Sequence, residues 1–282
     1  MTQLNILVTI DANYIKPLKV MLKSLFVSNP DENFRIFLMH SRLNPVEVSE
    51  IEVYVDRCGH SLSEVKISDE CFNKAPTVKH YTKEMYYRLL AYRYLPSELN
   101  RVLYLDPDIL VINPICELYH TNLSGWMYAA AYHDILLAKE INKLRFWEYD
   151  IEAYFNSGVL LMNLDLLREK VNEQEIYDFV RKHKNTLILP DQDILNSLYS
   201  QEIKKLDEFL YNYDVRYYRY RRIISKRRID MDYIINNTVI LHFCGKRKPW
   251  HDNYSGAFHS LYKHYEKLAF TGRDRDERQP PE

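Results

Sequence analysis

Two aspartates that follow a short apolar run are the side chains best suited to do chemistry. The run Leu103–Leu105 is strand-like, and Asp106 and Asp108 follow it, separated by Pro107. Side chains two residues apart in an extended chain point to the same side, so both carboxylates would face one point. They would repel each other unless a cation lay between them, and carboxylate oxygens suit Mg²⁺ or Mn²⁺. The alternative is a simple turn, since Asp-Pro-Asp is also good turn chemistry.

A second group of reactive side chains surrounds His242. This histidine ends an apolar run, Gly245 follows at an expected bend, and residues 246–248 are all basic. An imidazole can complete a mixed nitrogen and oxygen metal site, which favours Mn²⁺ over the harder Mg²⁺. Lys248 could contact phosphate oxygens as a point charge. A lone histidine is usually structural and a lone lysine is usually solvated, but here both belong to one short cluster of phosphate-compatible groups.

The elements that must position these side chains alternate between strands and helices in the first part of the chain. There we expect strands at 4–10, 34–39, 65–67 and 101–105, and helices at 14–28, 45–56 and 83–94. This alternation is typical of a parallel sheet covered by helices. The carboxyl ends of such strands form the ligand crevice. After Pro114 we expect strands at 127–131, 157–162 and 238–242, and helices at 173–183, 192–199 and 257–268.

The composition excludes several classes of protein. A net charge of −1 does not indicate a nucleic-acid partner, because nucleic-acid binders usually have a strong basic excess. The 6 glycines form neither a dinucleotide fingerprint nor a P-loop, so any nucleotide phosphates must be held in another way. The 4 cysteines are scattered and form no CxxC motif, which indicates reduced thiols and a cytosolic location. We find no signal peptide and no apolar run of membrane-spanning length.

Several blocks, taken in order, make the chain resemble the retaining nucleotide-sugar glycosyltransferases of family 8, from about Leu4 to Leu268. This family includes bacterial lipooligosaccharide galactosyltransferases and glycogenin-like enzymes. The blocks contain Asp11, Asn13 and Tyr14; residues 87–89; Asp106-Pro107-Asp108; residues 155–159; residues 191–196; and residues 242–250, which match the pattern HxxGxxKPW at every fixed position. The resemblance implies a single α/β domain of the Rossmann-like GT-A type with a mixed central sheet. This domain would span residues 1–270 and leave 271–282 as a disordered tail.

The resemblance also implies an activity and a set of site residues. The chain would transfer a hexose, glucose or galactose, from a UDP-sugar to a glycan, glycolipid or glycoprotein acceptor with retention of configuration. The implied metal ligands for Mn²⁺, or alternatively Mg²⁺, are Asp106, Asp108 and His242. The implied donor-binding residues are Asp11, Asn13, Arg88, Asp106, Asn156, Ser157, Gly158, Asp191, Gln192, Gly245 and Lys248. The implied catalytic residues are Arg88, Asp191 and Gln192. Such an enzyme would serve cell-surface polysaccharide or lipopolysaccharide biosynthesis.

Each of these roles has a simpler structural alternative. Asp11 and Asn13 could cap the next helix, and Asp191 could cap its own, because these residue types are favoured at helix starts. Arg88 could pair with a carboxylate. An amide such as Gln192 is a poor nucleophile, so retention could instead come from attack on the face from which UDP departs. At the level of the whole protein, the alternatives are another metal-dependent nucleotide enzyme, a hydrolase or nucleotidyltransferase, or a non-catalytic UDP-sugar-binding protein.

The segment Arg216–Arg228 carries many cations interleaved with tyrosines. It could be a solvated surface loop. It could equally contact an anionic membrane surface or a charged acceptor. The second interpretation is compatible with a cytoplasmic enzyme that lies peripherally at the inner face of the membrane.

Overall fold

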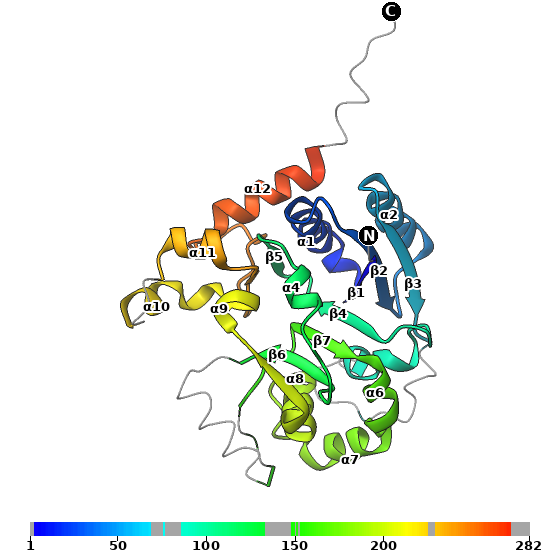
Figure 1. Cartoon of the computed structure of the whole chain (residues 1–282). Coiled ribbons are helices and arrows are strands. Elements are labelled where there is room, and N and C mark those ends of the chain that lie inside the picture. Colours follow the sequence, from blue (N-terminus) through cyan, green and yellow to red (C-terminus); the bar gives the residue numbers. More distant parts are fainter. Residues whose placement is uncertain are drawn as a thin grey trace, which may run out of the picture.

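A mixed seven-stranded sheet forms the centre of the computed structural model, which describes residues 3–68, 76, 86–132, 148–149, 151, 153–224 and 229–271 (Figure 1). The strand order is β3-β2-β1-β4-β7-β6-β8. The strands are β1 (Gln3–Thr9), β2 (Asn33–His40), β3 (Ser61–Lys66), β4 (Arg101–Leu105), β6 (Tyr128–Ala131), β7 (Val159–Asn163) and β8 (Ile203–Leu206). The predicted α/β class with a mixed sheet is confirmed.

The direction of β7 determines which loops meet at the edge of the sheet. Strands β3, β2, β1 and β4 are parallel to one another, whereas β7 is antiparallel to β4 and to β6. Leu105 at the end of β4 therefore pairs with Val159 at the start of β7. The residues just before β7 consequently lie beside those just after β4.

Helices cover both faces of this sheet, because its strands are apolar on both sides. Leu4, Ile6 and Val8 of β1 point to one face and pack with α1 (Ile15–Ser28) and α2 (Pro45–Arg57). Leu7 points to the other face, where α3 (Tyr87–Leu90), α7 (Glu173–His183) and α8 (Pro190–Tyr199) lie. A strand buried on both faces is rich in consecutive apolar residues, as residues 6–8 are in β1.

The segment 45–57 is helical despite its β-branched residues. The Asn44 side chain accepts hydrogen bonds from the backbone of residues 46 and 47, and the Glu47 side chain accepts one from the Asn44 backbone. This capping box, with Pro45 in the first turn, fixes where α2 begins. Val48, Ile51 and Val55 are buried at helical spacing.

A second, three-stranded sheet carries the histidine of the predicted metal site. It consists of β5 (Ile109–Val111), β9 (Tyr213–Asp214) and β10 (Ile240–His242) in the order β5-β10-β9. Strand β10 is antiparallel to β5, and His242 pairs with Ile109. Since Asp108 immediately precedes β5, this register brings His242 beside Asp108.

The remaining helices complete the fold around these two sheets. They are α4 (Cys116–Tyr119), α6 (Leu164–Lys170), α9 (Glu208–Tyr211), α10 (Tyr218–Ile224), α11 (Met231–Asn237) and α12 (His259–Phe270). Helix α12 packs against α1, far from it in sequence (Figure 1).

Several predicted elements differ from those observed. The strand expected at 65–67 spans Ser61–Lys66, and the strand expected at 157–162 begins only at Val159. Of the helix expected at 83–94, the described residues form α3 and a short 3₁₀ turn over Ala91–Arg93. Strands β5, β8 and β9 and helices α4, α6, α9, α10 and α11 were not predicted. The expected tail lies outside the described residues except for Thr271.

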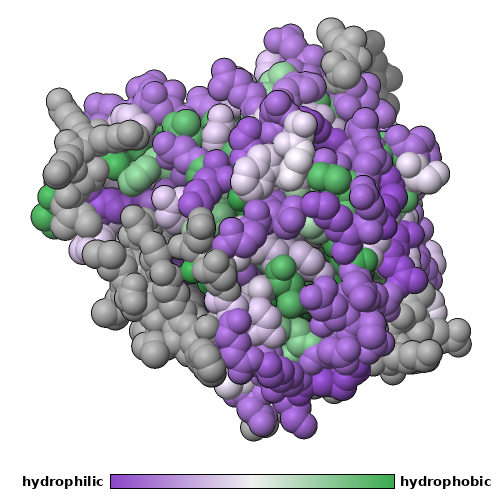
Figure 2. All heavy atoms as spheres, turned by 60° about the horizontal axis from the view of Figure 1, so that its bottom comes forward, coloured by the Kyte–Doolittle hydropathy of each residue, from purple (hydrophilic) through white to green (hydrophobic). Residues whose placement is uncertain are grey.

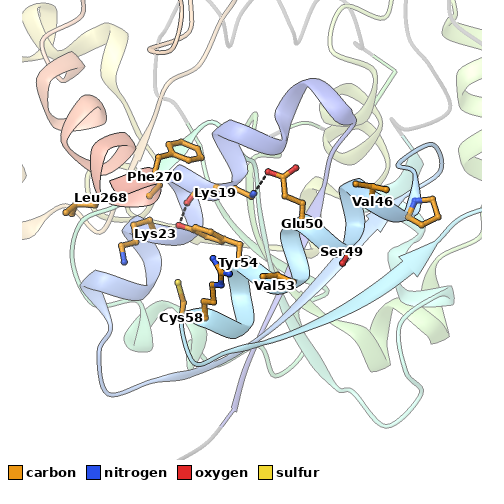
Figure 3. Close-up of a pocket in the computed structure, with 13 residues that line it drawn as sticks. Lys19, Lys23, Val46, Ser49, Glu50, Val53, Tyr54, Cys58, Leu268 and Phe270 are labelled. Carbon is orange, nitrogen blue, oxygen red and sulfur yellow. Dashed lines mark hydrogen bonds and ion pairs between the residues drawn. The ribbon is translucent and has the colours of Figure 1, made fainter. Parts of the chain in front are cut away.

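A hollow of about 810 Å³ lies between α1, α2 and α12 (Figure 3). Buried Lys19 pairs with Glu50 at 2.6 Å, and the Tyr54 hydroxyl donates to the Lys19 carbonyl at 3.0 Å. None of the predicted site residues lines this hollow, so it is separate from the predicted metal centre.

The described surface offers no membrane-spanning element. Within the ranges given above, every helix is too short or too polar to cross a bilayer. On the face shown in Figure 2, hydrophilic residues predominate and apolar ones form small groups.

Candidate active site

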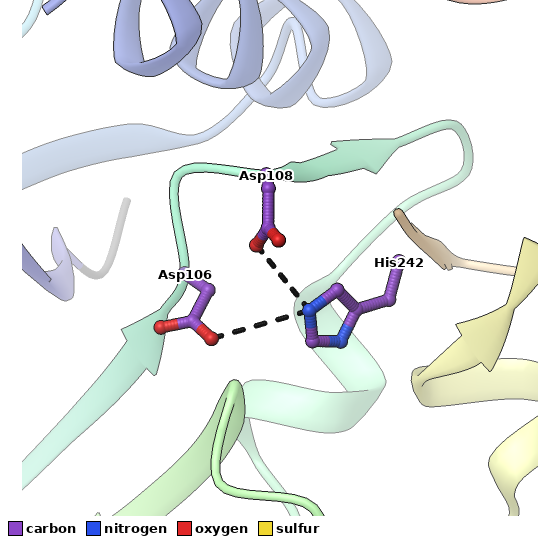
Figure 4. A group of neighbouring side chains, drawn as sticks. All are labelled: Asp106, Asp108 and His242. Atoms are coloured by element: carbon purple, nitrogen blue, oxygen red, sulfur yellow. Dashed lines mark ion pairs between the residues drawn. The ribbon is translucent and has the colours of Figure 1, made fainter. Parts of the chain in front are cut away.

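Three side chains from three chain segments converge on one point between the two sheets (Figure 4). Asp106 follows β4, Asp108 precedes β5, and His242 ends β10. The His242 Nε2 atom lies 3.3 Å from Asp108 Oδ1 and 4.0 Å from Asp106 Oδ2. One ligand atom from each residue can be chosen so that all three lie within 4.8 Å of one another. The structure thus brings together all three predicted metal ligands.

The hydrogen bonds of His242 direct its Nε2 lone pair toward the carboxylates. The imidazole is 3 % exposed, and its Nδ1 atom lies 2.8 Å from Asn212 Oδ1. Asn212 Nδ2 donates to Asn156 Oδ1 at 2.8 Å, which leaves the Asn212 oxygen as the acceptor facing His242. Nδ1 must therefore carry a proton, so in the neutral ring Nε2 is the unprotonated nitrogen.

This arrangement fits a divalent cation. A lone pair and two carboxylate oxygens that face one point repel one another unless positive charge lies between them. Burial alone would raise the pKa of Asp108, but the positive charges of a protonated His242 and of Lys248 hold that pKa below its ordinary value, so Asp108 is anionic when no cation is present. A bound cation would replace the proton on His242 Nε2. A mixed nitrogen and oxygen ligand set of this kind suits Mn²⁺.

Gly158 leaves room for the cluster. A Cβ atom at this position would lie 2.4 Å from His242 Cε1 and 2.6 Å from Asp106 Oδ2. The Gly158 carbonyl accepts a hydrogen bond from the Asp106 backbone at 2.8 Å, which fixes this close approach. Only glycine fits this position without displacing a predicted metal ligand.

Arg88 joins the metal cluster to the predicted sugar-facing residues. Its guanidinium lies 3.1 Å from Asp106 Oδ1 and 3.1 Å from Asp191 Oδ2, and it donates to the Ser157 carbonyl at 3.0 Å. Burial alone would lower the pKa of Arg88, but Asp106, Tyr104 and Asp191 raise it above its ordinary value. Pairing with carboxylates, the structural alternative for Arg88, is therefore observed, and it occurs inside the candidate site.

Asp191 does not cap its helix. Helix α8 begins at Pro190, one residue before the predicted start, with Leu189 at the N-cap position. The backbone N–H groups of Ile188 and Leu189 donate instead to Asp193 Oδ2, at 2.8 and 3.1 Å. Asp191 Oδ2 accepts from Ser157 Oγ at 2.9 Å and faces Arg88. The capping alternative for Asp191 is wrong, because Leu189 occupies the N-cap position of α8 and no side chain there accepts a capping hydrogen bond.

A chain of amides links the metal cluster to Gln192. From His242 it runs through Asn212 to Asn156, whose Nδ2 donates to Gln192 Oε1 at 3.1 Å. The Ser157 backbone N–H donates to the same Gln192 oxygen at 3.3 Å. The His242 imidazole and the Gln192 amide are therefore connected through the hydrogen bonds of two intervening asparagines.

The other predicted residues occupy different positions around the cluster. Asp11 and Asn13 are exposed, and Asp11 caps the 3₁₀ turn Ala12–Tyr14 by accepting from the Asn13 backbone at 2.8 Å. The capping alternative is thus observed for Asp11. Lys248 Nζ contacts Asp108 and donates to the Phe243 carbonyl at 3.0 Å, so it is not a freely solvated charge. Gly245 has a φ of 90°, which favours glycine at the bend after β10.

Two residues of this site were missed by sequence reasoning. Asn212 is 0 % exposed and orients His242, yet an isolated asparagine between two tyrosines carries no recognisable signal. The Tyr104 hydroxyl donates to Asp106 Oδ1 at 2.6 Å, but in the sequence this residue is simply part of an apolar strand.

We expect Asn212→Leu to weaken Mn²⁺ binding by about ten- to a hundredfold, as is typical when the hydrogen-bond partner of a metal-bound histidine is lost. Asn212→Asp keeps an acceptor for Nδ1 and should retain most of the affinity. The measurement is the Mn²⁺ concentration that gives half-maximal activity, with the melting temperature recorded for each variant. Equal Mn²⁺ requirements for the Asn212→Leu variant and the wild-type enzyme would show that Asn212 does not orient the ligand.

The fold and the site together define an α/β enzyme domain with a carboxylate and imidazole metal site at the edge of its sheet. The sequence profile of glycosyl transferase family 8 matches residues 5–254, and the chain therefore belongs to this family. The expected class, a hexosyltransferase that retains configuration, is confirmed.

Individual relatives are similar to this chain over most of its length and most of their own. The lipopolysaccharide 1,2-glucosyltransferase of Escherichia coli K12 is 26 % identical over 270 residues, which cover 94 % of this chain and 77 % of that protein. The lipopolysaccharide 1,3-galactosyltransferase of Salmonella typhimurium is 23 % identical over 267 residues, which cover 88 % of this chain and 73 % of that protein. The galactosyltransferase LgtC, solved with donor and acceptor sugar analogues, has the same fold, with a TM-score of 0.79. It is 24 % identical in sequence, and the match covers 94 % of this chain and 96 % of the LgtC chain.

Proposed function

We propose that this hexosyltransferase takes glucose or galactose from a UDP-sugar, with Mn²⁺ held by Asp106, Asp108 and His242. One observation carries the proposal: this metal-competent cluster contacts Arg88 directly, and it is connected to Asp191 through Arg88 and to Gln192 through two asparagine amides. When bound, the cation supplies positive charge that stabilises the diphosphate as its bond to the sugar breaks.

The residues around the cluster would hold the donor at both ends. Lys248 and the Gly245 backbone would hold the diphosphate, and Asp11 and Asn13 would contact the uridine. Arg88, Asn156, Ser157, Gly158, Asp191 and Gln192 would line the hexose. The Asp191 carboxylate would accept hydrogen bonds from sugar hydroxyls, and Arg88 would hold it in place.

The contacts of Gln192 favour attack by the acceptor on the face from which UDP departs. The Gln192 carbonyl oxygen already accepts hydrogen bonds from Asn156 Nδ2 and the Ser157 backbone. Those bonds reduce the nucleophilicity of an amide that is weak at the outset, which argues against a covalent intermediate. Gln192 would instead position the hexose while the diphosphate oxygen accepts the proton of the acceptor hydroxyl.

The acceptor would be a glycan, glycolipid or glycoprotein, and the names of the two bacterial relatives support cell-surface polysaccharide or lipopolysaccharide biosynthesis. Cys58, Cys116 and Cys244 are free thiols in the described structure, which supports a cytoplasmic location. Helix α10 exposes Tyr220 and Ile223, at 56 % and 83 %, among arginines. This face would make peripheral contact with an anionic inner membrane surface.

A UDP-sugar panel tests the proposal. With Mn²⁺, we expect UDP release from UDP-glucose or UDP-galactose to rise when a saccharide acceptor is added. The product should carry an α-linked hexose, because the donor linkage is α and configuration is retained. Proton NMR of the anomeric signal distinguishes the two outcomes. A β-linked product, or no turnover with either donor over a broad acceptor panel, would overturn the proposal.

A further inference from the structure

A hollow of about 430 Å³ opens beside the candidate site and is lined by positive charge. Arg216 lines it from the turn before α10, Arg219 lines it from α10 itself, and Lys246 and Arg247 line it from the loop after β10. Among the described residues, no Asp or Glu side chain lines this hollow. Its volume lies within the range of small-ligand sites.

Three of these four cations are available to a ligand. Arg216 is neutralised by buried Asp214, through an Nη2 to Oδ2 contact of 2.6 Å and Nε contacts of 3.0 and 3.1 Å. Arg219, Lys246 and Arg247 form no ion pair within the described part of the chain. Cations that converge on a concave surface focus a positive potential there, unlike cations spread over a convex one.

The hollow adjoins the metal cluster and shares Gly245 with the contacts proposed for the donor diphosphate. Cys244 and Gly245, which form part of its wall, follow His242 at the end of β10 by two and three residues. Lys248, by contrast, contacts Asp108 and does not line the hollow. A ligand in this hollow would therefore lie beside the donor diphosphate, where the three cations could contact a negative group of its own.

We infer that this hollow binds the acceptor and that the acceptor is an anionic saccharide, one that carries a phosphate or carboxylate group. The inference rests on the proposed function, which requires a second substrate to lie next to the reacting carbon. Arg219 and Arg247 bind the anionic group by charge-assisted hydrogen bonds, and this contact selects charged acceptors over neutral ones.

Calorimetry on the enzyme saturated with UDP and Mn²⁺ tests the inference, with glucose, glucose 6-phosphate and glucuronate as probes. We expect at least one charged sugar to bind about tenfold or more tightly than glucose, the size of effect typical of hydrogen bonds to charged groups. The double variant Arg219→Gln with Arg247→Gln should abolish this preference and leave the Kd for UDP unchanged. Lys184→Gln, an exposed lysine elsewhere on the surface, is the matched control and should behave as wild type.

The possible failures are distinguishable. If UDP and Mn²⁺ do not bind at all, the proposed function fails. If UDP binds but the three sugars bind equally, the acceptor inference is wrong. A double variant that loses UDP affinity would assign the cations to the donor. Binding to phosphatidylglycerol vesicles that depends on Arg219 and Arg247, without any preference for charged sugars, would assign them to a membrane surface.

Discussion

Gly158→Ala should nearly abolish hexosyl transfer, because the added methyl group would occupy the space of two metal ligands. The new Cβ atom would lie 2.4 Å from His242 Cε1 and 2.6 Å from Asp106 Oδ2, so one or both must move. The cation stabilises the leaving diphosphate, so its loss removes several kcal/mol of transition-state stabilisation. This loss corresponds to a fall in kcat/KM of about a thousandfold. Steady-state kinetics at several Mn²⁺ concentrations measure this effect.

Gly59→Ala is the matched control for this substitution. Gly59 has a φ of 83°, and an added Cβ atom would meet no heavy atom within 4 Å. This variant should lose about 1 kcal/mol of stability through backbone strain and keep its kcat/KM. If Gly158→Ala retained wild-type activity and Mn²⁺ affinity, the cluster would not be the metal centre.

Asp191→Asn should lower kcat/KM for the donor by about ten- to a hundredfold, because hydrogen bonds from sugar hydroxyls to a charged oxygen contribute roughly 1.5–3 kcal/mol. The variant should keep its melting temperature, since Leu189 and not Asp191 is at the N-cap of α8 and Arg88 retains Asp106 as a partner. UDP alone should bind normally, because Asp191 is assigned to the hexose. Donor kinetics, UDP titration and thermal unfolding together measure these three quantities.

The variant Asp193→Asn, two residues further along the same helix, distinguishes a structural role from a role in sugar binding. Asp193 is fully buried, accepts hydrogen bonds from the backbone of Ile188 and Leu189, and contacts the Tyr154 hydroxyl. Its amide variant should lose stability, by about 1–3 kcal/mol for each buried donor left without an acceptor. If Asp191→Asn also lost mainly stability and kept wild-type turnover, Asp191 would be a structural residue, and the sugar-binding role would pass to Arg88, Asn156 and Gln192.

The parts of the fold that the sequence predicts are those with long, regular patterns. Strand β1 is mostly apolar, and in α1 the spacing of Leu18, Met21, Leu22 and Leu25 matches a buried helical stripe. Strand β5 has 3 residues, too few for a periodicity to be read, although its pairing with the predicted strand β10 brings His242 to Asp108.

The site was predicted where its residues form local motifs and missed where they act through long-range contacts. Asp106, Asp108 and His242 stand in motifs, and the structure brings them together. Asn212 contacts a histidine 30 positions further along the chain, so no local pattern could identify it. The capping alternative for Asp191 was wrong because aspartate is favoured at helix starts, whereas the start of α8 at Pro190 can be located only from the backbone geometry.

Metal dependence of UDP release is the measurement that tests the central claim most directly. Enzyme treated exhaustively with EDTA should lose turnover of UDP-glucose and UDP-galactose, and Mn²⁺ should restore it more fully than Mg²⁺. Asp108→Asn should require far more Mn²⁺ for the same rate, because it removes a charged ligand beside His242. Full turnover by the metal-free enzyme would contradict the assignment of Asp106, Asp108 and His242 as the metal centre of a family 8 glycosyltransferase.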